Sequence, residues 1–401
     1  MSWRYQPAVL SPVDPAALLT GIAGALGGAH YARQSVSDEL SRRYGASAVL
    51  LTDSGTSALV VALRTLLPVG GTIAFPAYAC IDLTAAALRA GVRVRLYDID
   101  PMTLSPDLDS VRKAMERGVD AILVAHLYGY PADVTSVKSV AKERGVLVIE
   151  DAAQAAGGKL GGKRLGELAD VSVLSFGRGK GTTAGSGGAL LARAPASVRA
   201  IDAMAARLAA GSRGGREVIT LAAQWMLARS ELYRLPASIP GLRLGEMVFR
   251  PAGEPRPMSA TAAAILPSAL KMEGRELAQR RERAGELLAV MRKSGGRLTP
   301  IHSVPESEPG FLRLPFLDAI GDMAPNASVG AMRGYPLTLD QHDQLRPILA
   351  DGERAGPGAQ RLRDRLFTAP THSRVSTADI RRFQQWVARL DSPVRLEALA
   401  T

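Results

Sequence analysis

Strand-length apolar runs and helix-length amphipathic segments alternate between residues 46 and 193, and this alternation constrains the fold more than any other feature. The expected strands are 46–52, 72–75, 92–98, 120–125, 146–150, 171–176 and 188–192. The expected helices between them are 56–67, 81–90, 107–117 and 133–144. Strands separated by helices need crossover connections, which favour a mostly parallel, mixed sheet sandwiched by helices. Sheets of this kind bind ligands at the carboxyl ends of their strands.

The rest of the chain has a different pattern. A long helical pattern rich in Ala, Leu and Arg covers 259–293, after a stretch at 236–257 that is rich in Pro and Gly. Beyond it we expect strands at 311–317 and 327–333 and helices at 340–349 and 376–390. The chain therefore divides into a large α/β domain over residues 1–250 and a smaller part over 251–401. This smaller part holds the long connecting helix and a C-terminal α+β domain.

Composition excludes several classes of function. The net charge is +11, which favours anionic partners. No zinc-finger or RNA-recognition signature accompanies the charge, so nucleic acid is not an expected partner. The single Cys can form neither an internal disulfide nor a thiolate metal site, and it favours a cytoplasmic location. No apolar run reaches the length of a membrane span, and Ala16–Gly28 lacks a clear signal-peptide cleavage site.

The first strand runs into TDSGTSAL at 52–59. Gly55 permits a tight turn there, and Thr56 and Ser57 open the next helix with hydroxyls and free backbone N–H groups. A helix N-terminus of this kind suits a phosphate group. An ordinary helix cap would use the same residue types, so this motif alone does not decide between the two interpretations.

Two other strands end in charged residues. The strand VLVIE is followed by Asp151, and an acid at the end of a buried strand is costly unless a cation or a hydrogen-bond donor meets it. No second ligand stands at a useful spacing, so a metal site is not expected. The strand VSVLSF is followed by GRGKGTTAGSGG at 177–188, with six glycines in twelve residues and Lys180 among them. This loop matches neither a P-loop nor a dinucleotide fingerprint.

A phosphate cradle, a buried carboxylate and a loop lysine are together the groups that pyridoxal phosphate needs. The lysine forms the Schiff base, and the acid pairs with the pyridine nitrogen so that the ring can accept electrons. Hydroxyl and backbone donors hold the phosphate.

These motifs also carry a family resemblance. SGTSAL (54–59), FPAY (75–78), YDIDP (97–101), HLYGYPAD (126–133), VIEDAAQAAGG (148–158) and SFGRGK (175–180) stand in the order typical of the family. The sequence resembles the DegT/DnrJ/StrS group of sugar aminotransferases, which are pyridoxal-phosphate enzymes of fold type I. The resemblance is strong from about residue 30 to 193 and continues through 257–288 and 368–380.

The resemblance implies roles for individual residues. Lys180 would be the Schiff-base lysine and would shuttle a proton between Cα of the donor and C4′ of the cofactor. Asp151 would bond the pyridine nitrogen, and Gln154 would lie near the phenolic oxygen of the ring. Three hydroxyl residues would bind the phosphate: Thr56, Ser57 and Ser175. An amino acid, usually glutamate in the family, would donate the amine to a keto sugar that is nucleotide-linked, in a site formed between the two subunits of a homodimer.

Two departures from the family pattern stand out. An aromatic ring commonly stacks on the cofactor at the position of Cys80; Tyr78 either replaces this ring or points elsewhere. The family often lends an Asn of the partner subunit to the phosphate just before the long helix, where this chain reads PAGEPRPMSA (251–260). The only Asn is Asn326, so Arg178 or Arg256 is the alternative donor.

Two histidines and one acid have ambiguous roles. His126 follows a strand near the expected site and is a candidate substrate contact, or a core histidine. His372 is expected to line the cleft from the small domain, and Arg178 is a further candidate substrate residue. Glu150 is expected to be structural. Two other functions stay open: a pyridoxal-phosphate enzyme for a non-sugar substrate, such as another transaminase, a lyase or a decarboxylase, and a non-catalytic binding or regulatory member of the fold.

Overall fold

A computed structural model describes residues 5–27, 29–208, 211–227, 229–234, 239 and 248–391. Half of the predicted Pro- and Gly-rich stretch at 236–257 therefore lies outside the described residues.

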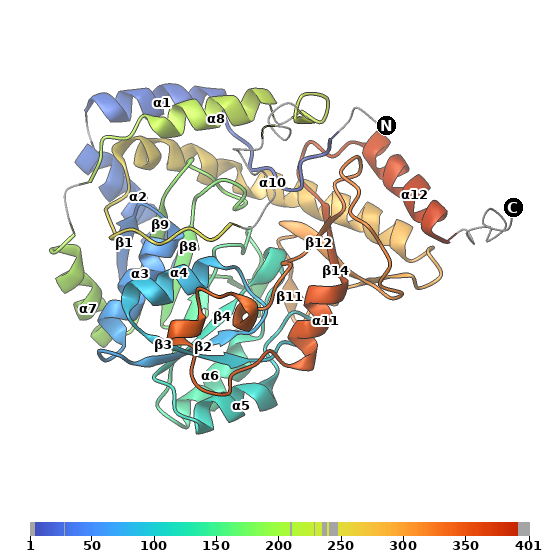
Figure 1. The fold of residues 1–401 in the computed structure, drawn as a ribbon. Helices are drawn as coiled ribbons and strands as arrows, with labels where there is room; N and C mark the ends of the chain where they lie inside the picture. Colours follow the sequence, from blue (N-terminus) through green and yellow to red (C-terminus); the bar gives the residue numbers. More distant parts are fainter. Residues whose placement is uncertain are drawn as a thin grey trace, which may run out of the picture.

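A seven-stranded sheet forms the centre of the large domain (Figure 1). Its strands are β1 (Ala48–Thr52), β2 (Thr72–Pro76), β3 (Arg93–Tyr97), β4 (Ala121–Ala125), β5 (Leu147–Asp151), β8 (Val171–Ser175) and β9 (Gly188–Ala192). The spatial order is β1-β9-β8-β5-β4-β2-β3. Only β9 runs antiparallel to its neighbours β1 and β8, and the other pairs are parallel. The prediction of a mostly parallel, mixed sheet is thus confirmed.

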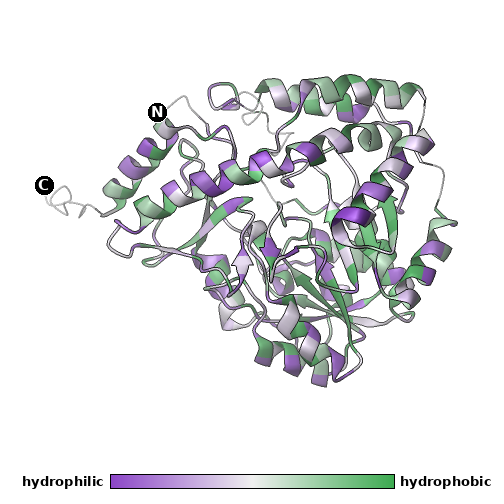
Figure 2. Ribbon diagram, turned by 180° about the vertical axis from the view of Figure 1, so that it is seen from behind, coloured by the Kyte–Doolittle hydropathy of each residue, from purple (hydrophilic) through white to green (hydrophobic). Residues whose placement is uncertain are grey.

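Helices cover the sheet as its crossover connections require. They are α3 (Gly55–Leu66), α4 (Asp82–Ala90), α5 (Leu108–Glu116), α6 (Val134–Lys142) and α7 (Pro195–Ala205). Helix α3 packs across β8 and β9, while α6 packs on β5 and α5 on β3. Every residue of β4 and β9 is buried, because strands covered on both faces need continuous apolar runs. Figure 2 shows the strands as mainly hydrophobic and the outer helices as mixed.

A second helical layer lies beside the sheet, formed by α1 (Pro15–Leu26), α2 (Ala29–Tyr44), α8 (Arg216–Leu227) and α10 (Ala260–Met291). Helices α1 and α8 run alongside α10 in Figure 1. A Cβ on Gly24 would lie 2.6 Å from Cβ of Ala264, so the close approach of α1 to α10 requires glycine. The apolar N-terminal segment is therefore a helix that packs one face, with Ala17, Gly21 and Gly24, against the protein, while Leu19, Ile22 and Leu26 are exposed. Among the described residues, no helix is both long and apolar enough to cross a membrane.

The C-terminal part has a four-stranded antiparallel sheet with the order β10-β12-β14-β13. Its strands are β10 (Leu298–Pro300), β12 (Arg313–Asp318), β13 (Met332–Arg333) and β14 (Leu366–Pro370), and its helices are α11 (Pro357–Arg365) and α12 (Thr377–Asp391). A small third sheet joins β6 (Lys159–Leu160), β7 (Lys163–Arg164) and β11 (Ser307–Glu308). The division of the chain at residue 250 stays a prediction.

Two predicted elements of this part are wrong. The strand predicted at 327–333 shrinks to Met332–Arg333, because Asn326 accepts hydrogen bonds from Ser328 and starts a turn. The helix predicted at 340–349 is replaced by two 3₁₀ turns, Leu339–Gln341 and Arg346–Ile348. Proline at position 347 lacks an N–H and disfavours helical backbone in the residue before it.

Candidate functional site

Lys180 and Asp151 lie at the same edge of the central sheet. Asp151 ends β5 and pairs with Val173 of β8, and Lys180 stands in the loop that follows β8. The charge of Lys180 lowers the pKa of Asp151 and also that of Cys80, so the three side chains share one neighbourhood. The structure thus brings together the two residues on which the sequence-based interpretation depends most.

Asp151 is a carboxylate held away from water. Burial raises its pKa, while the hydrogen bond from the backbone N–H of Ala153 and the charge of Lys180 lower it by a smaller amount. The Ala153 nitrogen lies 3.0 Å from Oδ1. Because the net pKa is raised, a cationic partner placed against this carboxylate would be strongly stabilised. A protonated pyridine nitrogen is such a partner.

A narrow cavity, with room for about one water molecule, lies where these strands end. Its lining residues are Ala79, Cys80, Leu83, Ala125, His126, Leu127, Asp151 and Gln154. Burial and the nearby carboxylate of Asp82 raise the pKa of Cys80 to about 12, so this residue presents a neutral thiol to the cavity. The structure therefore places Cys80 at the wall of the site, as its alignment with the stacking position implies.

Tyr78 does not line this cavity, contrary to one of the two placements considered from the sequence. It is buried, and its hydroxyl accepts the backbone N–H of Tyr335 at 2.7 Å and lies 3.4 Å from the hydroxyl of Tyr128. The tyrosine is turned toward the small domain because these polar partners satisfy its hydroxyl there.

Gln154 connects the cavity to this group of tyrosines. Its Nε2 donates to the hydroxyl of Tyr335 at 2.7 Å, and its Oε1 accepts the backbone N–H of Tyr128 at 3.1 Å. Both ends of the amide are therefore held, which fixes the orientation of the side chain at the cavity wall.

The N-terminus of α3 lies against the end of β8. The Ser54 side chain caps the helix by accepting the Ser57 N–H at 3.0 Å. A Cβ on Gly55 would lie 2.8 Å from Cβ of Ser175, so only glycine allows the helix start to approach Ser175 this closely. Thr56 follows in the first turn. The N–H of Ser57 is used by this cap and its hydroxyl bonds Ser54, while the helix start and the Ser175 hydroxyl meet in an arrangement that suits a phosphate.

Arg280 is a buried residue of this site that the sequence analysis missed. It extends from α10, and its guanidinium donates to the carbonyls of Ala156 at 3.1 Å and Gly181 at 3.0 Å. One side chain thus links the loop that follows Asp151 to the loop that carries Lys180. Its spacing with Ala284 and Leu287 places it on the buried stripe of the helix, and a charged residue in that register is the signal that could have revealed it.

His126 forms part of the cavity wall with both ring nitrogens occupied. Nδ1 accepts the N–H of Ala132 at 3.0 Å, so Nε2 carries the proton and donates to Oε1 of Glu150 at 2.9 Å. Glu150 also accepts backbone N–H groups of Gly166, Leu168 and Ala169. This burial and bonding fit the structural role expected for Glu150.

The remaining predicted residues do not line the cavity. His372 is buried, and its ring nitrogen donates to the carbonyl of Pro7 at 2.9 Å, so it does not line the cavity as expected. The N-terminal segment covers it instead. Arg178 and Arg256 are exposed, and Asn326 belongs to the turn of the small domain described above.

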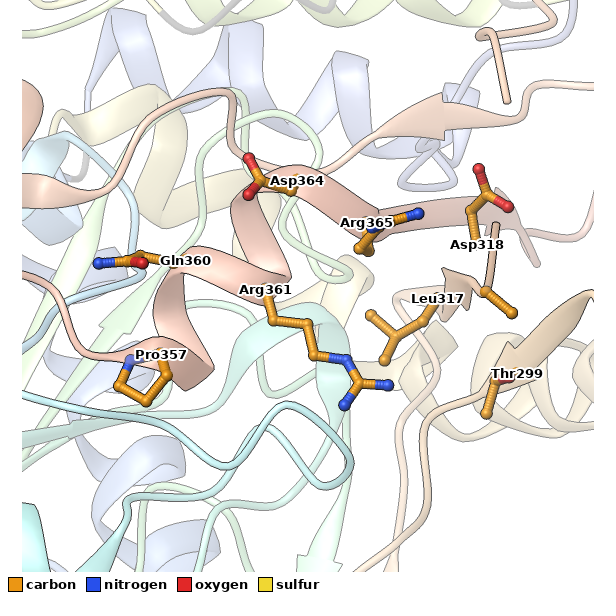
Figure 3. Close-up of a pocket in the computed structure, with 9 residues that line it drawn as sticks. Thr299, Leu317, Asp318, Pro357, Gln360, Arg361, Asp364 and Arg365 are labelled. Atoms are coloured by element: carbon orange, nitrogen blue, oxygen red, sulfur yellow. The ribbon is translucent and has the colours of Figure 1, made fainter. Parts of the chain in front are cut away.

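A second hollow lies in the small domain, between α11 on one side and β10 and β12 on the other (Figure 3). Its lining includes Arg361, Asp364 and Arg365 beside Leu317, and it contains none of the predicted site residues. The candidate site is therefore the cavity at the strand ends.

The residues at the strand ends fit pyridoxal phosphate. The glycine-dependent approach of α3 to Ser175 forms an anion cradle, and the desolvated carboxylate of Asp151 needs a cation. Lys180 supplies an amine in the same neighbourhood. The match to three separate parts of one cofactor is more specific than any of the motifs alone.

Comparison with known proteins agrees with this fit. The chain is 34% identical over 154 residues to 3-amino-5-hydroxybenzoate synthase of Amycolatopsis mediterranei, covering 38% of this chain and 40% of the relative. It is 32% identical over 148 residues to dTDP-4-dehydro-2,3,6-trideoxy-D-glucose 4-aminotransferase of Saccharopolyspora spinosa, covering 37% and 38%. These matches span about two fifths of each relative.

The fold is shared over nearly the whole length. The crystal structure of the aminotransferase TlmJ from Streptoalloteichus hindustanus matches with a TM-score of 0.75 and 21% identity, covering 96% of this chain and 98% of that one. A profile of the DegT/DnrJ/EryC1/StrS aminotransferases matches residues 32–387. With the lysine, the acid and the phosphate cradle in the family order, the chain belongs to the DegT/DnrJ/EryC1/StrS aminotransferase family.

Proposed function

We propose that the protein is a pyridoxal-phosphate aminotransferase that moves an amino group from an amino acid to a keto sugar. The juxtaposition of Lys180 and Asp151 across β8 and β5 is the observation that carries the proposal. When bound, pyridoxal phosphate supplies an aldehyde that condenses with amines and a ring that accepts the electron pair released at the donor's α-carbon.

The residues of the chain divide the remaining tasks. The Lys180 amine would hold the cofactor and then carry a proton from Cα of the donor. Asp151 would keep the pyridine nitrogen protonated, because its desolvated carboxylate gains from that positive charge. Gln154, fixed at both ends of its amide, would orient the phenolic oxygen. The phosphate would be held by Thr56, Ser57 and Ser175.

Several relatives support a nucleotide-linked sugar as the acceptor. Their names include a dTDP-sugar aminotransferase and a UDP-N-acetyl-3-dehydro-glucosamine 3-aminotransferase. The net charge of +11 favours attraction of a diphosphate-bearing substrate. Glutamate is the proposed donor, by the family resemblance.

A non-sugar acceptor is the second candidate. The presence of Cys80 where the family commonly has an aromatic ring favours it, because a thiol changes the shape and polarity of the cavity wall. The similarity to 3-amino-5-hydroxybenzoate synthase points in the same direction.

The visible absorption of the purified protein tests the proposal. Wild type should be yellow, and Lys180→Ala should remove the band, while the matched surface change Lys163→Ala should leave it intact. Adding L-glutamate should bleach the band, and a keto-sugar acceptor should restore it. A colourless wild type would favour the non-catalytic alternative. If keto acids restore the band but keto sugars do not, the proposed sugar acceptor is rejected.

We also propose that the protein is a cytoplasmic homodimer, since sites in the family form between two subunits. Sedimentation of the purified protein would show a mass near twice the 42.3 kDa of the chain. A monomeric mass at all concentrations would contradict this proposal.

A further inference from the structure

Among the residues that the structure describes, Arg313 has no counter-ion. It stands at the start of β12, and its side chain is partly buried. No carboxylate of the described residues lies within ion-pair distance. Within the described part of the chain, its one hydrogen bond is long, from Nη2 to the carbonyl of Thr368 at 3.5 Å, and its Nε is buried without a partner. A guanidinium placed in this way costs folding free energy, because nothing replaces the water that it has lost.

The groups around Arg313 do not neutralise it. Burial lowers its pKa, and the hydroxyls of Tyr78, Tyr128 and Tyr335 raise it by a smaller amount. The pKa of each of these tyrosines is itself raised above its ordinary value, first of all by burial. The three phenols are therefore neutral at physiological pH. A partly accessible guanidinium among neutral hydroxyls remains free to pair with an anion brought by a ligand.

Arg313 is connected to the cavity at the strand ends. The backbone of Gly310, just before β12, donates to the carbonyl of Gly129 at 2.7 Å, which seats the start of β12 on the turn that carries Tyr128. Tyr335 in turn accepts a hydrogen bond from Gln154, and Gln154 lines the cavity beside Asp151. The small-domain arginine is therefore a neighbour of the tyrosines that Gln154 links to the cavity.

We propose that Arg313 binds a carboxylate group of the substrate. Guanidinium pairs with carboxylate through two parallel hydrogen bonds. The Nε of Arg313 has no hydrogen-bond partner among the described residues and would be available for one of them. This inference rests on the proposed aminotransferase function. The carboxylate could belong to the α-carbon of the amino donor or to an acid acceptor, and the two sources are separable by experiment.

The donor arm uses the visible band of the holoprotein. The rate at which L-glutamate bleaches the band is compared with the rate for 4-aminobutanoate, which lacks the α-carboxylate. If the donor is the source, Arg313→Gln slows bleaching by L-glutamate about a hundredfold and leaves the slow reaction of 4-aminobutanoate unchanged. Arg313→Lys should restore part of the rate, because it keeps the charge but loses the two-pronged geometry.

The acceptor arm measures binding without turnover. Calorimetric titration of the holoprotein with 3-hydroxybenzoate and with its neutral amide, 3-hydroxybenzamide, tests for a cyclic carboxylate. If the acceptor is the source, wild type prefers the acid, Arg313→Gln removes the preference, and bleaching by L-glutamate is unaffected. Unchanged glutamate kinetics together with unchanged preference in the titration would overturn the inference.

The melting temperature distinguishes a ligand-binding arginine from one that only stabilises the fold. Because the guanidinium is unpaired, Arg313→Met should raise the melting temperature while it removes the carboxylate preference. The matched control is Arg381→Met on α12, whose side chain is exposed and which should leave both properties unchanged. A lower melting temperature for Arg313→Met would mark a structural role and reject the proposal. A wild type with no visible band would instead reject the proposed function.

Discussion

Replacing Arg280 by Met tests how the two loops of the site are held together. The guanidinium is 1% exposed and donates to two backbone carbonyls, Ala156 and Gly181, while Glu276 lies 3.8 Å from its Nε. Methionine fills a similar volume and leaves both carbonyls and the buried acid without their cation. Removing one member of such a buried arrangement costs about 3–5 kcal/mol.

This cost converts into a measurable shift of the melting temperature. The entropy of unfolding is about 2.1 cal/mol/K per residue, or about 0.8 kcal/mol/K for a chain of this length, so the melting temperature should fall by about 4–6 °C. Thermal unfolding followed by circular dichroism measures it. The neighbouring Arg281→Met is the matched control, because that side chain forms a partly exposed ion pair with Glu308 worth about 1 kcal/mol or less.

Function should change with stability in the Arg280 variants. Arg280→Lys retains the charge but reaches only one carbonyl, so it should fall between wild type and Arg280→Met in melting temperature and in cofactor affinity. A melting temperature for Arg280→Met within 1 °C of the Arg281→Met control would refute the reasoning. It would mean that the two loops are held by their own backbone contacts.

Three further predictions concern titratable groups. Burial lowers the pKa of His372 to about 4. The stability that its neutral form contributes is therefore present above pH 6.5 and is lost as the pH falls toward 4, a change of about 3 kcal/mol in the free energy of unfolding. His372→Gln should abolish this pH dependence in unfolding experiments across that range. The raised pKa of Asp151 means that its stabilising contribution exists at low pH and is lost as the pH rises. The apoprotein of Asp151→Asn should therefore have a higher melting temperature than wild-type apoprotein at pH 8, and it should bind the cofactor more weakly. An equal or lower melting temperature would contradict this prediction. The pKa of about 12 for Cys80 predicts that iodoacetamide alkylates its thiol at pH 7.5 about a thousandfold more slowly in the native protein than in the unfolded protein. Mass spectrometry measures both alkylation rates, and comparable rates would refute this prediction.

The sheet and the placement of its ligand-binding edge could be predicted from the sequence because they depend on local patterns. Apolar runs separated by amphipathic helices require parallel strands, and parallel strands end together. Asp151 and Lys180 were therefore expected at one edge before any contact between them was known. The chain's glycine pattern at 177–188 indicated the loop in the same way.

The contacts between distant segments could not be predicted. Tyr78 turns toward Tyr335, which lies 257 residues away along the chain, and His372 meets Pro7, 365 residues away. Local propensity carries no information about such pairs. The helix predicted at 340–349 failed for a related reason: its apolar spacing was adequate, but Pro347 and tertiary packing prevailed over it.

Mapping the site of cofactor attachment tests the account's central claim most directly. Borohydride treatment of the yellow holoprotein, followed by proteolysis and mass spectrometry, should place one pyridoxyl group on the peptide that contains Lys180 and on no other lysine. Attachment at a different lysine, or no attachment to a protein that retains its visible band, would contradict the claim that this loop amine and Asp151 together form the cofactor site.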